Sequence, residues 1–506
     1  MASVLLGQSY YLRFDPKLWE AMQPYPPLGT LYAASVLRQR GYEVSFFDAM
    51  LAGSEEEWAQ ALDRHQPRFA VLYEDNFNYL SKMCLLRMRT AAHTMIEMAK
   101  NRGCTVILCG ADATDHAEAY LARGADFVLL GEGEETLVEL LDNLSGKSDK
   151  TPQDILGLVY HAREGVVHNH RRPDIRELDA LPFPAWDLVD VPRYRDIWRS
   201  RHGYYSMNMV TTRGCPFHCN WCAKPIWGQR YNSRSPENVV AEMQWLKENF
   251  APDHISFVDD IFGLKPGWLP RLGDLVETRG VKIPFKCLSR VDLLTRPGEV
   301  EAMRRAGAQT VWMGAESGSQ KVLDAMDKGT RVEQIAEAAR LLKSVGIRVG
   351  FFLQFGYPGE TRTEIEQTIQ MVRDCNPDDI GVSVSYPMPG TGFFESVKTQ
   401  LGLQQNWNDS SDLAMLFPGA YSTAFYRQLH RVIHHEFRAR KAWQALRRGF
   451  NFRQLARLAY NSLALPFSRW QLNRLAVRPN TSLQLPHLSH EQAANPTPQE
   501  TDERAV

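Results

Sequence analysis

The chain has 506 residues, of which 44% are hydrophobic and 23% are charged, and its formal net charge is −1. This length exceeds what one hydrophobic core usually supports and predicts about three domains. The near-neutral charge gives no support to a nucleic-acid partner, because such partners usually require a basic surface.

Targeting and membrane-spanning segments are not expected from the sequence. The first residues, MASVLLGQSYYLRFD, lack a basic region followed by a long apolar one, and no apolar run reaches the length of a membrane span. The eight cysteines are not spaced as a secreted disulfide framework. We therefore expect a protein of a reducing, cytoplasmic compartment.

Residues 1–147 alternate short apolar runs with helical patterns. The strand-like runs are SVLLGQ, EVSFFDA, RFAVLYE, TVILCGA and DFVLLGE, and a helix-like stretch follows each of them. Five such units predict a doubly wound parallel sheet with helices on both faces. Ligands of such sheets bind at the carboxyl ends of the strands, where Gly110, Gly131 and Gly133 occur in this sequence.

Residues 148–204 are predicted to be a hairpin and linker between two domains. A polar stretch, SGKSDKTPQD, ends the first domain. The following LVYHAREGVVHNHR has the pattern of a small hairpin, and the proline-bearing LPFPAWDLVDVP leads into the next domain.

Residues 205–400 hold a second alternation of strands and helices. The six strand candidates are YSMNMVTT, HISFVDD, IPFKCLS, TVWMGAE, RVGFFLQFG and DIGVSVSYP, and a helical stretch follows each of the first five. Ser235 and Pro236 form a typical helix start, with serine as the cap and proline at the first helical position. These units predict a partial (β/α)6 barrel. Unusual polar or glycine-rich sequence follows every strand, which places the site at the strand ends.

Residues 401–478 form a helical, basic and aromatic region, and residues 479–506 are polar and proline-containing, so we expect them to be disordered. Two interpretations of the C-terminal helices stay open. We favour a helical lid that packs across the barrel with its charges solvated. The other interpretation is a basic amphipathic helix in peripheral contact with a membrane surface, where it would deliver a lipid-like substrate.

Three cysteines, Cys215, Cys219 and Cys222, follow the first barrel strand in the spacing C-x3-C-x2-C. Thiolates suit zinc or iron–sulfur clusters, and most such sites use four protein ligands. A cubane 4Fe–4S cluster on three cysteines leaves one iron open to the amine and carboxylate of a small molecule. The alternative is a zinc site completed by His218 or His202, although this spacing is unusual for zinc.

The cysteine spacing, at this place in a partial barrel, resembles the signature of the radical S-adenosylmethionine enzymes. The resemblance implies a 4Fe–4S cluster whose open iron binds S-adenosyl-L-methionine. It also implies one-electron cleavage of that cofactor to a 5′-deoxyadenosyl radical. The electron would come from an external reductant of the flavodoxin or ferredoxin type.

Further positions match the pattern of this family. Trp221 stands at the aromatic position whose neighbourhood supports the adenine, and Arg290 is implied to pair with the cofactor carboxylate. Ser289 or Glu316 is implied to bond the ribose, and residues 314–330 resemble the family's fourth-strand segment. The ordinary alternative for an acidic residue is a helix cap or a surface ion pair.

Two aspartates, Asp259 and Asp260, follow the second barrel strand. In the family, a motif at this place contacts the amino group of S-adenosylmethionine. The usual glycine-glycine-glutamate of that motif is not present in this sequence. The resemblance therefore implies that Asp259 and Asp260 contact the amino group because they occupy the place of the motif, although their residue types differ from it.

The N-terminal segments PYPPLGTLYAASVLRQRGYEVSFFDA and CGADATDHAEAYLARGADFVLLGEGEETLVELL resemble the cobalamin-binding domain fused to many radical S-adenosylmethionine enzymes. The resemblance implies cobalamin contacts at Gly110, Gly131, Gly133 and Thr136. The motif D-x-H-x-x-G, whose histidine ligates cobalt in methionine-synthase-type domains, does not occur here, and many radical members also lack it. The alternative is a doubly wound domain that has lost cobalamin or binds another nucleotide.

The combined resemblance covers about four-fifths of the chain and implies a cobalamin-dependent enzyme that methylates an unactivated carbon of a small-molecule or lipid-like substrate. A second candidate with the same cofactors is oxidation or cyclisation, as in the anaerobic magnesium-protoporphyrin monomethyl ester cyclase group. A methylthiotransferase would carry more cluster cysteines, and Cys84, Cys104 and Cys109 are not obviously spaced for that role. A non-enzymatic iron–sulfur sensor is the remaining alternative.

Overall fold

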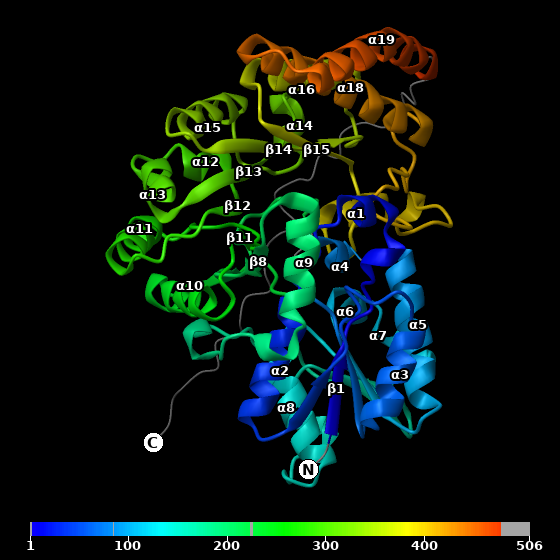
Figure 1. Ribbon diagram of the computed structural model, residues 1–506. Helices are drawn as coiled ribbons and strands as arrows, with labels where there is room; N and C mark the ends of the chain where they lie inside the picture. Colours follow the sequence, from blue (N-terminus) through cyan, green and yellow to red (C-terminus); the bar gives the residue numbers. More distant parts are fainter. Residues whose placement is uncertain (1–2, 84, 223–225, 477–506) are drawn as a thin grey trace, which may run out of the picture.

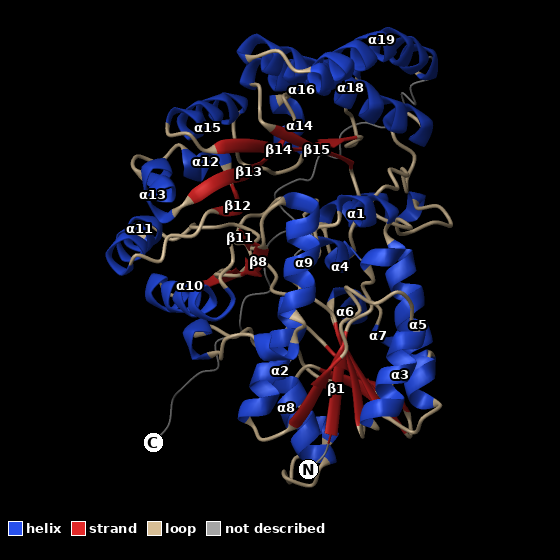
Figure 2. Cartoon of the chain, in the orientation of Figure 1, coloured by secondary structure: helices blue, strands red, loops and turns tan. Residues whose placement is uncertain are grey.

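A computed structural model describes residues 3–83, 85–222 and 226–476 of the chain. Figure 1 shows two α/β halves, the N-terminal one below and the second above, with the last two helices at the far end of the second half. Figure 2 shows that the strands of the two halves form separate sheets. The halves correspond to the two alternations of strands and helices in the sequence.

The first sheet has seven strands in the order β2-β1-β3-β4-β5-β6-β7. Strands β1 to β5 run parallel, which confirms the doubly wound sheet. The strands are β1 (Ser3–Gly7), β2 (Glu43–Phe46), β3 (Phe69–Tyr73), β4 (Thr105–Cys109), β5 (Phe127–Leu129), β6 (Leu158–Ala162) and β7 (Gly165–His168).

Helices cover both faces of this sheet because its central strands are apolar on both sides. In β3, Val71 packs in the hydrophobic cluster of one face and Leu72 in that of the other, as successive residues of a strand should. The first face carries α2 (Leu28–Gln39) and α8 (Glu134–Leu144). The second carries α3 (Glu56–His65), α5 (Leu86–Lys100) and α7 (Ala117–Ala122).

The hairpin predicted within residues 148–204 is present, but it belongs to the first sheet and not to a separate linker. β6 pairs antiparallel with β5, and β7 pairs antiparallel with β6. This pairing covers the edge that β5 would otherwise expose. Helix α9 (Val191–His202) then leads to the second half, and its buried Trp198 donates from Nε1 to the carbonyl of Pro24 at 2.8 Å.

The second sheet has six strands in the order β15-β14-β13-β12-β11-β8, and all its neighbours are parallel, as predicted for the partial barrel. The strands are β8 (Ser206–Met209), β11 (His254–Phe257), β12 (Phe285–Ser289), β13 (Ala308–Glu316), β14 (Arg348–Phe355) and β15 (Asp379–Val384). The helices between them are α10 (Pro236–Phe250), α11 (Trp268–Arg279), α12 (Val291–Leu294), α13 (Glu299–Ala306), α14 (Gln320–Ala325), α15 (Val332–Ser344) and α16 (Arg362–Cys375).

Local sequence sets the start of α10 as predicted. The Ser235 side chain accepts a hydrogen bond from the backbone N–H of Asn238 at 3.1 Å, and Pro236 occupies the first helical position. The remaining short elements are α1 (Pro16–Ala21), α4 (Tyr79–Met83), α6 (Ala111–Asp115), α17 (Gly392–Val397), the strands β9 (Thr212–Arg213) and β10 (Asn232–Ser233), and 3-10 turns at Leu12–Phe14, Pro152–Asp154, Leu178–Ala180, Trp186–Leu188 and Lys398–Gln400.

The C-terminal region is a pair of long helices, α18 (Thr423–Arg448) and α19 (Phe452–Leu475), packed side by side. α18 runs along the outside of α16. Its Tyr426 lies beside Gly356, just before α16, and Gln444 donates to Asn376, just after α16, at 3.0 Å. The pair therefore covers the outer side of the barrel, which differs from the lid across the barrel that we favoured. None of the helices in the described residues is long and apolar enough to cross a membrane.

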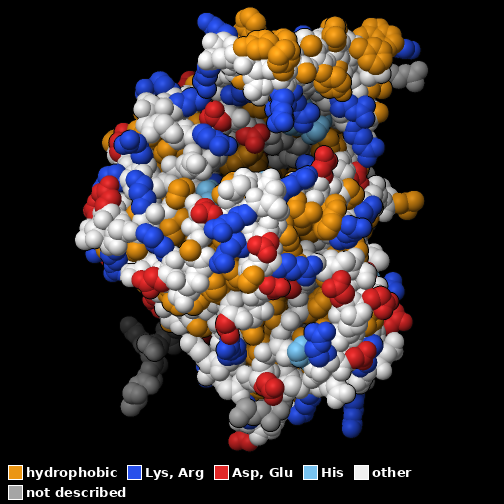
Figure 3. Space-filling model, viewed as in Figure 1, with side chains coloured by type: hydrophobic (Ala, Val, Ile, Leu, Met, Phe, Trp, Pro, Cys, Tyr) orange, Lys and Arg blue, Asp and Glu red, His pale blue; other side chains and the backbone are white. Residues whose placement is uncertain are grey.

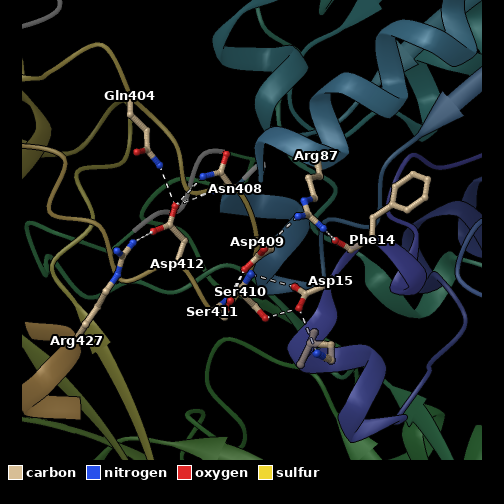
Figure 4. Close-up of polar contacts among 11 residues, drawn as sticks. Phe14, Asp15, Arg87, Gln404, Asn408, Asp409, Ser410, Ser411, Asp412 and Arg427 are labelled. Atoms are coloured by element: carbon tan, nitrogen blue, oxygen red, sulfur yellow. Dashed lines mark hydrogen bonds and ion pairs between the residues drawn. The ribbon is translucent and has the colours of Figure 1, made fainter. Parts of the chain in front are cut away.

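A loop that precedes α18 ties the barrel half to the N-terminal half, as Figure 4 shows. Asp15 accepts hydrogen bonds from the backbone N–H and the hydroxyl of Ser410 at 3.0 and 2.7 Å, and Arg87 lies 3.8 Å from Asp409. Asp412 of the same loop pairs with Arg427 of α18 at 2.9 Å. The loop thus joins three parts of the chain that are far apart in sequence.

The carboxyl ends of the two sheets face each other across the junction of the halves. Arg213, which follows β8, pairs with Glu132 and Glu134, which follow β5, at 3.0 and 2.7 Å. Asp260, which follows β11, pairs with Lys82 of α4 at 2.6 Å. Because parallel α/β sheets bind ligands at these ends, the fold directs both binding edges to one region.

Candidate active site

The cysteine loop begins where β8 ends, and a small sheet brings its two ends together. Asn232 pairs with Arg213 and Ser233 with Thr212, antiparallel. Gly214 has a φ of +83°, and a Cβ there would lie 2.3 Å from the carbonyl oxygen of Arg230. Only glycine fits this turn immediately before the first cysteine.

The three cysteines stand at the barrel's strand ends, as predicted. Cys215 is buried against Ile261 and Leu293, which follow the second and third barrel strands. Cys219 and Cys222 are half-buried, and the backbone N–H of Cys222 donates to the carbonyl of Cys219 at 3.4 Å. One short loop therefore carries all three sulfur atoms to the predicted edge.

Arg290 reaches the cysteine loop from the end of β12. Its Nη1 donates to the Cys219 sulfur at 3.7 Å, and its guanidinium lies 3.5 Å from the ring centroid of Phe217. Two further contacts fix it, to Asp292 at 3.0 Å and to the carbonyl of Lys328 at 2.9 Å. A buried, fixed positive charge at this place attracts the negative charge of a thiolate-ligated cluster.

Lys328, which lies within the 314–330 segment, is a second positive charge at this place. Its Nζ donates to Glu316 at 2.9 Å, and both side chains are buried. Burial alone would lower the pKa of Lys328, but the charges of Glu316 and Cys219 outweigh it, and the pKa is raised. The lysine therefore stays charged between the loop and the end of β13.

Glu316 and Trp221 are gathered around this lysine. Glu316 has a φ of +57°, a left-handed conformation that is uncommon outside glycine and is found at functional sites. Lys328 Nζ lies 5.6 Å from the ring centroid of Trp221. Arg290 and Lys328 thus lie beside Cys219, and Glu316 and Trp221 lie beside Lys328. The cofactor contacts expected of Arg290, Glu316 and Trp221 stay predictions.

Two buried polar atoms beside this group have no hydrogen-bond partner among the described residues. They are Nε1 of Trp221 and the hydroxyl of Ser289, at the end of β12. Buried polar groups normally have partners, so these two atoms fit a polar ligand such as S-adenosylmethionine. The cysteine donor set with its two neighbouring cations likewise fits an anionic iron–sulfur cluster.

Asp259 and Asp260 both have protein partners, although Oδ2 of Asp259 is buried without one among the described residues. Oδ1 of Asp259 accepts from the backbone N–H of Thr211 at 2.8 Å and from the hydroxyls of Thr211 and Thr212 at 2.9 and 2.7 Å. Burial raises the pKa of Asp259 to about 6. Asp259 therefore anchors the segment that leads into the cysteine loop, while Asp260 holds Lys82. Their contact with the cofactor amino group stays a prediction.

The glycines of the N-terminal half allow close packing at the strand ends. A Cβ on Gly110 would lie 2.7 Å from Cβ of Glu74, and one on Gly133 would lie 2.3 Å from the sulfur of Cys109. Gly131, at a φ of +73°, lies beside Arg171. Each glycine is thus explained by its neighbours, and its contact with cobalamin stays a prediction.

Thr136 is fully buried and already bonded at both its donor and acceptor positions. Its hydroxyl donates to the carbonyl of Leu156 at 3.0 Å and accepts from Nε of Arg172 at 2.9 Å. These contacts hold α8 against the residues that flank β6 and β7. They give Thr136 a structural role in addition to the predicted one.

The end of β1 has stronger signs of a ligand site than the glycines do. The Gln8 side chain is fully buried, and neither its oxygen nor its nitrogen has a partner among the described residues. The hydroxyl of the next residue, Ser9, is also buried and unpartnered within that part of the chain. A buried amide and hydroxyl fit the amide-bearing edge of cobalamin. Sequence patterns gave no reason to choose them.

Buried Arg213 connects the two predicted cofactor edges. The Arg213, Glu132 and Glu134 side chains are each only 4% exposed. Arg213 stands two residues before Cys215, and the two glutamates begin the turn and helix after β5. The only sequence signal was the occurrence of charges within two otherwise glycine-rich strand ends, GEGEE and TTRGC.

One of the two histidines of the zinc alternative has a partner elsewhere. In residues 3–83, 85–222 and 226–476, no group of three or more His, Cys, Asp or Glu side chains, the three cysteines included, is arranged to hold one metal ion. His202 is engaged elsewhere, because its Nε2 lies 2.8 Å from the carbonyl oxygen of Met22 and its ring packs near Trp198.

Two family models match the chain. The model of the radical SAM superfamily matches residues 209–372, and that of the B12 binding domain matches residues 19–141. The first range contains the cysteine loop and β11 to β14, and the second contains most of the first sheet. A radical SAM domain implies a 4Fe–4S cluster and S-adenosylmethionine, and a B12 binding domain implies cobalamin.

Curated relatives match about three-quarters of the chain. An uncharacterized methyltransferase of Pyrococcus horikoshii is 29% identical over 390 residues, which are 76% of this chain and 81% of the relative. An anaerobic magnesium-protoporphyrin IX monomethyl ester cyclase of Cereibacter sphaeroides is 27% identical over 74% of this chain and 61% of the relative.

Solved structures match the fold of both halves together. The radical S-adenosylmethionine methyltransferase TsrM from Kitasatospora setae gives a TM-score of 0.64 at 19% identity, over 79% of this chain and 78% of that chain. The cobalamin-dependent S-adenosylmethionine radical enzyme OxsB gives 0.68 at 18% identity, over 93% and 72%. The chain therefore carries a radical SAM domain and a B12 binding domain, as its two family models show.

Proposed function

We propose that the protein is a cobalamin-dependent methyltransferase that adds a methyl group to an unactivated carbon of a small-molecule or lipid-like substrate. The observation that carries the proposal is the meeting of the two strand-end edges, bridged by Arg213 between Glu132 and Glu134. Transfer of a methyl group from one half to a carbon activated in the other half requires adjoining sites. The arrangement of the two sheets supports that requirement.

The chain's own residues would hold the three cofactors in two groups. When bound, these cofactors supply the electron transfer, the radical and the methyl group. The residues of the barrel half would be Cys215, Cys219 and Cys222 for the cluster and Trp221, Ser289, Arg290 and Glu316 for S-adenosylmethionine. Those of the first half would be Gln8 and Ser9, with the backbone at Gly110, Gly131 and Gly133, for cobalamin.

Arg290 and Lys328 would keep the cysteine loop competent for this chemistry. Both are buried beside Cys219, where their positive charges would attract an anionic cluster. The loop's anchors, Gly214 and Asp259, hold it against the barrel by a turn and by three hydrogen bonds. An external reductant of the flavodoxin or ferredoxin type would deliver the electron.

Oxidation or cyclisation without methyl transfer is the second candidate. The identity of 27% with the cyclase of Cereibacter sphaeroides, over 74% of this chain, supports it. The same residues would serve both reactions, since the cofactors are the same. The product distinguishes them, because only methylation adds a methyl group.

The methylthiotransferase alternative has little support from the N-terminal cysteines. Cys104 precedes β4 and donates to the carbonyl of Pro67 at 3.3 Å, and Cys109 ends β4 in the core. Burial raises the pKa of both thiols, which disfavours the thiolate that a cluster ligand needs. Cys84 lies outside the described residues. An iron–sulfur sensor would be distinguished by the lack of S-adenosylmethionine cleavage.

Labelled S-adenosylmethionine tests the proposed reaction. The anaerobically reconstituted and reduced protein would be supplied with cobalamin, methyl-deuterated S-adenosylmethionine and a small-molecule and lipid extract. We expect S-adenosylhomocysteine only when cobalamin is present, and a product that carries the labelled methyl group. Formation of 5′-deoxyadenosine with an oxidised, unlabelled product and without S-adenosylhomocysteine would instead support the cyclase type.

A further inference from the structure

The pair of C-terminal helices exposes an unusual number of large apolar side chains. Of the 15 large hydrophobic residues exposed in the described chain, nine lie between residues 443 and 475. Figure 3 shows them as a cluster of hydrophobic side chains along the end of the molecule where α18 and α19 lie. We call the α19 part of this cluster the outer face, formed by Phe452, Leu455, Tyr460, Leu463, Phe467 and Trp470.

The outer face is one continuous stripe of the helix. Phe452, Leu455, Leu463 and Trp470 follow each other at steps of three, eight and seven residues, which bring them to the same side of an α-helix. Leu463 is 79% exposed and Phe452 78%. Single exposed apolar residues need no explanation, but a continuous apolar patch marks an interaction surface.

The inner side of α19 is more polar than its outer face. Asn461 and Ser468 are buried, and they meet α18 through hydrogen bonds: Asn461 Oδ1 lies 2.9 Å from Nδ1 of His435, and the carbonyl of Ser468 accepts from Gln428 at 3.0 Å. Leu472 is the one large apolar side chain of α19 that is fully buried within the described chain. A helix in water normally has the reverse arrangement, with the apolar stripe facing the core.

The charges around the outer face are mostly positive. Residues 437–475 contain nine Lys and Arg and no Asp or Glu, and Glu436, just before them, pairs with Arg469 at 2.6 Å. Arg447, Arg448, Arg453 and Arg457 are exposed at the end of the helix pair, and the Arg474 guanidinium lies 4.8 Å from the ring centroid of Trp470. Two copies meeting through this face would bring like charges together, which disfavours a second copy as the occupant.

We propose that the outer face of α19 docks on the surface of an anionic lipid bilayer, independently of the reaction that the enzyme catalyses. An apolar stripe flanked by arginines is the pattern of a helix that lies in the membrane interface, and tryptophan and tyrosine favour that depth. Each basic residue near an anionic surface adds to the attraction. Because no described helix could span the bilayer, the contact is with one leaflet.

Vesicle sedimentation with the full-length protein tests this surface. Vesicles of phosphatidylcholine and phosphatidylglycerol in equal parts should bind the protein, and binding should weaken in high salt and on phosphatidylcholine alone. Leu463→Glu with Phe467→Glu should reduce binding by about tenfold or more, since both side chains would enter the apolar layer. Leu403→Glu, which changes an exposed leucine outside the helix pair, is the matched control and should bind as the wild type does.

Each other result overturns the proposal. If the wild type failed to bind the vesicles, or if the double variant bound equally well, the outer face would not be a membrane-binding surface. A dimer seen by light scattering that the double substitution dissociates, without vesicle binding, would assign the face to a second copy. Circular dichroism and thermal unfolding establish that both variants are folded, so that lost binding is not lost structure.

Discussion

Lys328 ties the end of β13 to the cysteine loop through one buried ion pair, and its removal has two consequences. Lys328→Met leaves Glu316 buried without its partner and takes a positive charge from beside Cys219. Breaking a buried pair costs about 3–5 kcal/mol. We expect a lower unfolding temperature, less bound iron and 5′-deoxyadenosine formation slowed by about tenfold or more.

The matched control for Lys328 is Lys321→Met in α14. Lys321 pairs with Glu364 at 3.2 Å, but the lysine is largely exposed, so its loss should cost about 0–1 kcal/mol. The variant should keep its iron and its activity. If Lys328→Met retained both as well, Lys328 would have no part in the site.

Because Glu74 is buried, the free energy of unfolding is expected to depend on pH, and the sign of this dependence follows from the burial. Its carboxylate accepts from the backbone N–H of Ser9 at 3.0 Å, and burial raises its pKa to about 7, against 4.5 as the ordinary value. The folded state therefore binds more protons than the unfolded state between pH 4.5 and 7. Stability contributed by the neutral carboxyl is present at the low end of this window and is lost as pH rises through it.

Thermal unfolding of the cofactor-free protein across pH 4.5 to 8 measures this effect. The difference in unfolding temperature between Glu74→Gln and the wild type should grow in favour of the variant as pH rises. The glutamine oxygen can still accept from Ser9, but it has no charge to desolvate. A difference that stays constant with pH would show that Glu74 does not titrate in this range.

A family pattern pointed to some of the candidate site residues. The sequence did not point to those residues whose position depends on tertiary packing. Arg290 lies beside Cys219, and Trp221 and Glu316 lie beside Lys328, while the cofactor contacts of all three stay predictions. Lys328 stands in the ordinary-looking turn MDKGT, and Gln8 ends an apolar strand. Nothing in local periodicity shows that either side chain is buried at a strand end, because burial there depends on how separate strand ends pack together.

At the scale of elements, the cysteine loop depends on one glycine. Gly214→Ala would place a Cβ 2.3 Å from the Arg230 carbonyl, in a backbone conformation that costs alanine about 1–2 kcal/mol by itself. The backbone of Arg230 must then move, and with it the β9–β10 pairing. We expect clearly reduced iron incorporation and a lower unfolding temperature.

The Gly228→Ala variant, in the same loop, separates the effect of backbone strain from that of steric overlap with a neighbouring residue. Gly228 also has a positive φ, of +60°, but a Cβ there would meet nothing within 4 Å. This variant should lose only about 1–2 kcal/mol of stability and retain its iron. Equal loss of iron from both variants would contradict the role given to the close approach at Gly214.

The order of elements followed from the sequence, while some of their packing did not. All six barrel strands and the five parallel strands of the first sheet occur where the apolar runs predicted them. The β6–β7 hairpin was recognised but not its pairing with β5. The C-terminal helices were recognised, but their place was not. They pack along α16 and not across the barrel, and this depends on tertiary contacts such as the one between Gln444 and Asn376. Residues 479–506, predicted to be disordered, lie outside the described residues.

At the scale of the whole molecule, Arg213 holds the two cofactor-binding edges together. Arg213→Met would leave Glu132 and Glu134 buried and unpaired, at a cost of about 3–5 kcal/mol. We expect a lower unfolding temperature and faster proteolysis of the segment that links the halves. Adding Glu132→Gln and Glu134→Gln should restore much of the stability, because no buried charge is then left alone.

The control for Arg213 is another pair that bridges distant segments. Arg38 contacts Asp187 at 2.8 Å, but both side chains are exposed. Arg38→Met should therefore change stability by about 0–1 kcal/mol. If Arg213→Met behaved in the same way, the buried bridge would not be what joins the halves.

The central claim is that Cys215, Cys219 and Cys222 hold a cluster that cleaves S-adenosylmethionine beside a cobalamin-binding half. The most direct measurement is 5′-deoxyadenosine formation by the anaerobically reconstituted and reduced protein, together with its iron content and cobalamin absorption. Wild type and the half-buried control Cys375→Ala should both form 5′-deoxyadenosine and bind cobalamin, and Cys219→Ala should lose 5′-deoxyadenosine formation. Bound zinc with no cluster in the wild type, or undiminished 5′-deoxyadenosine from Cys219→Ala, would contradict the claim.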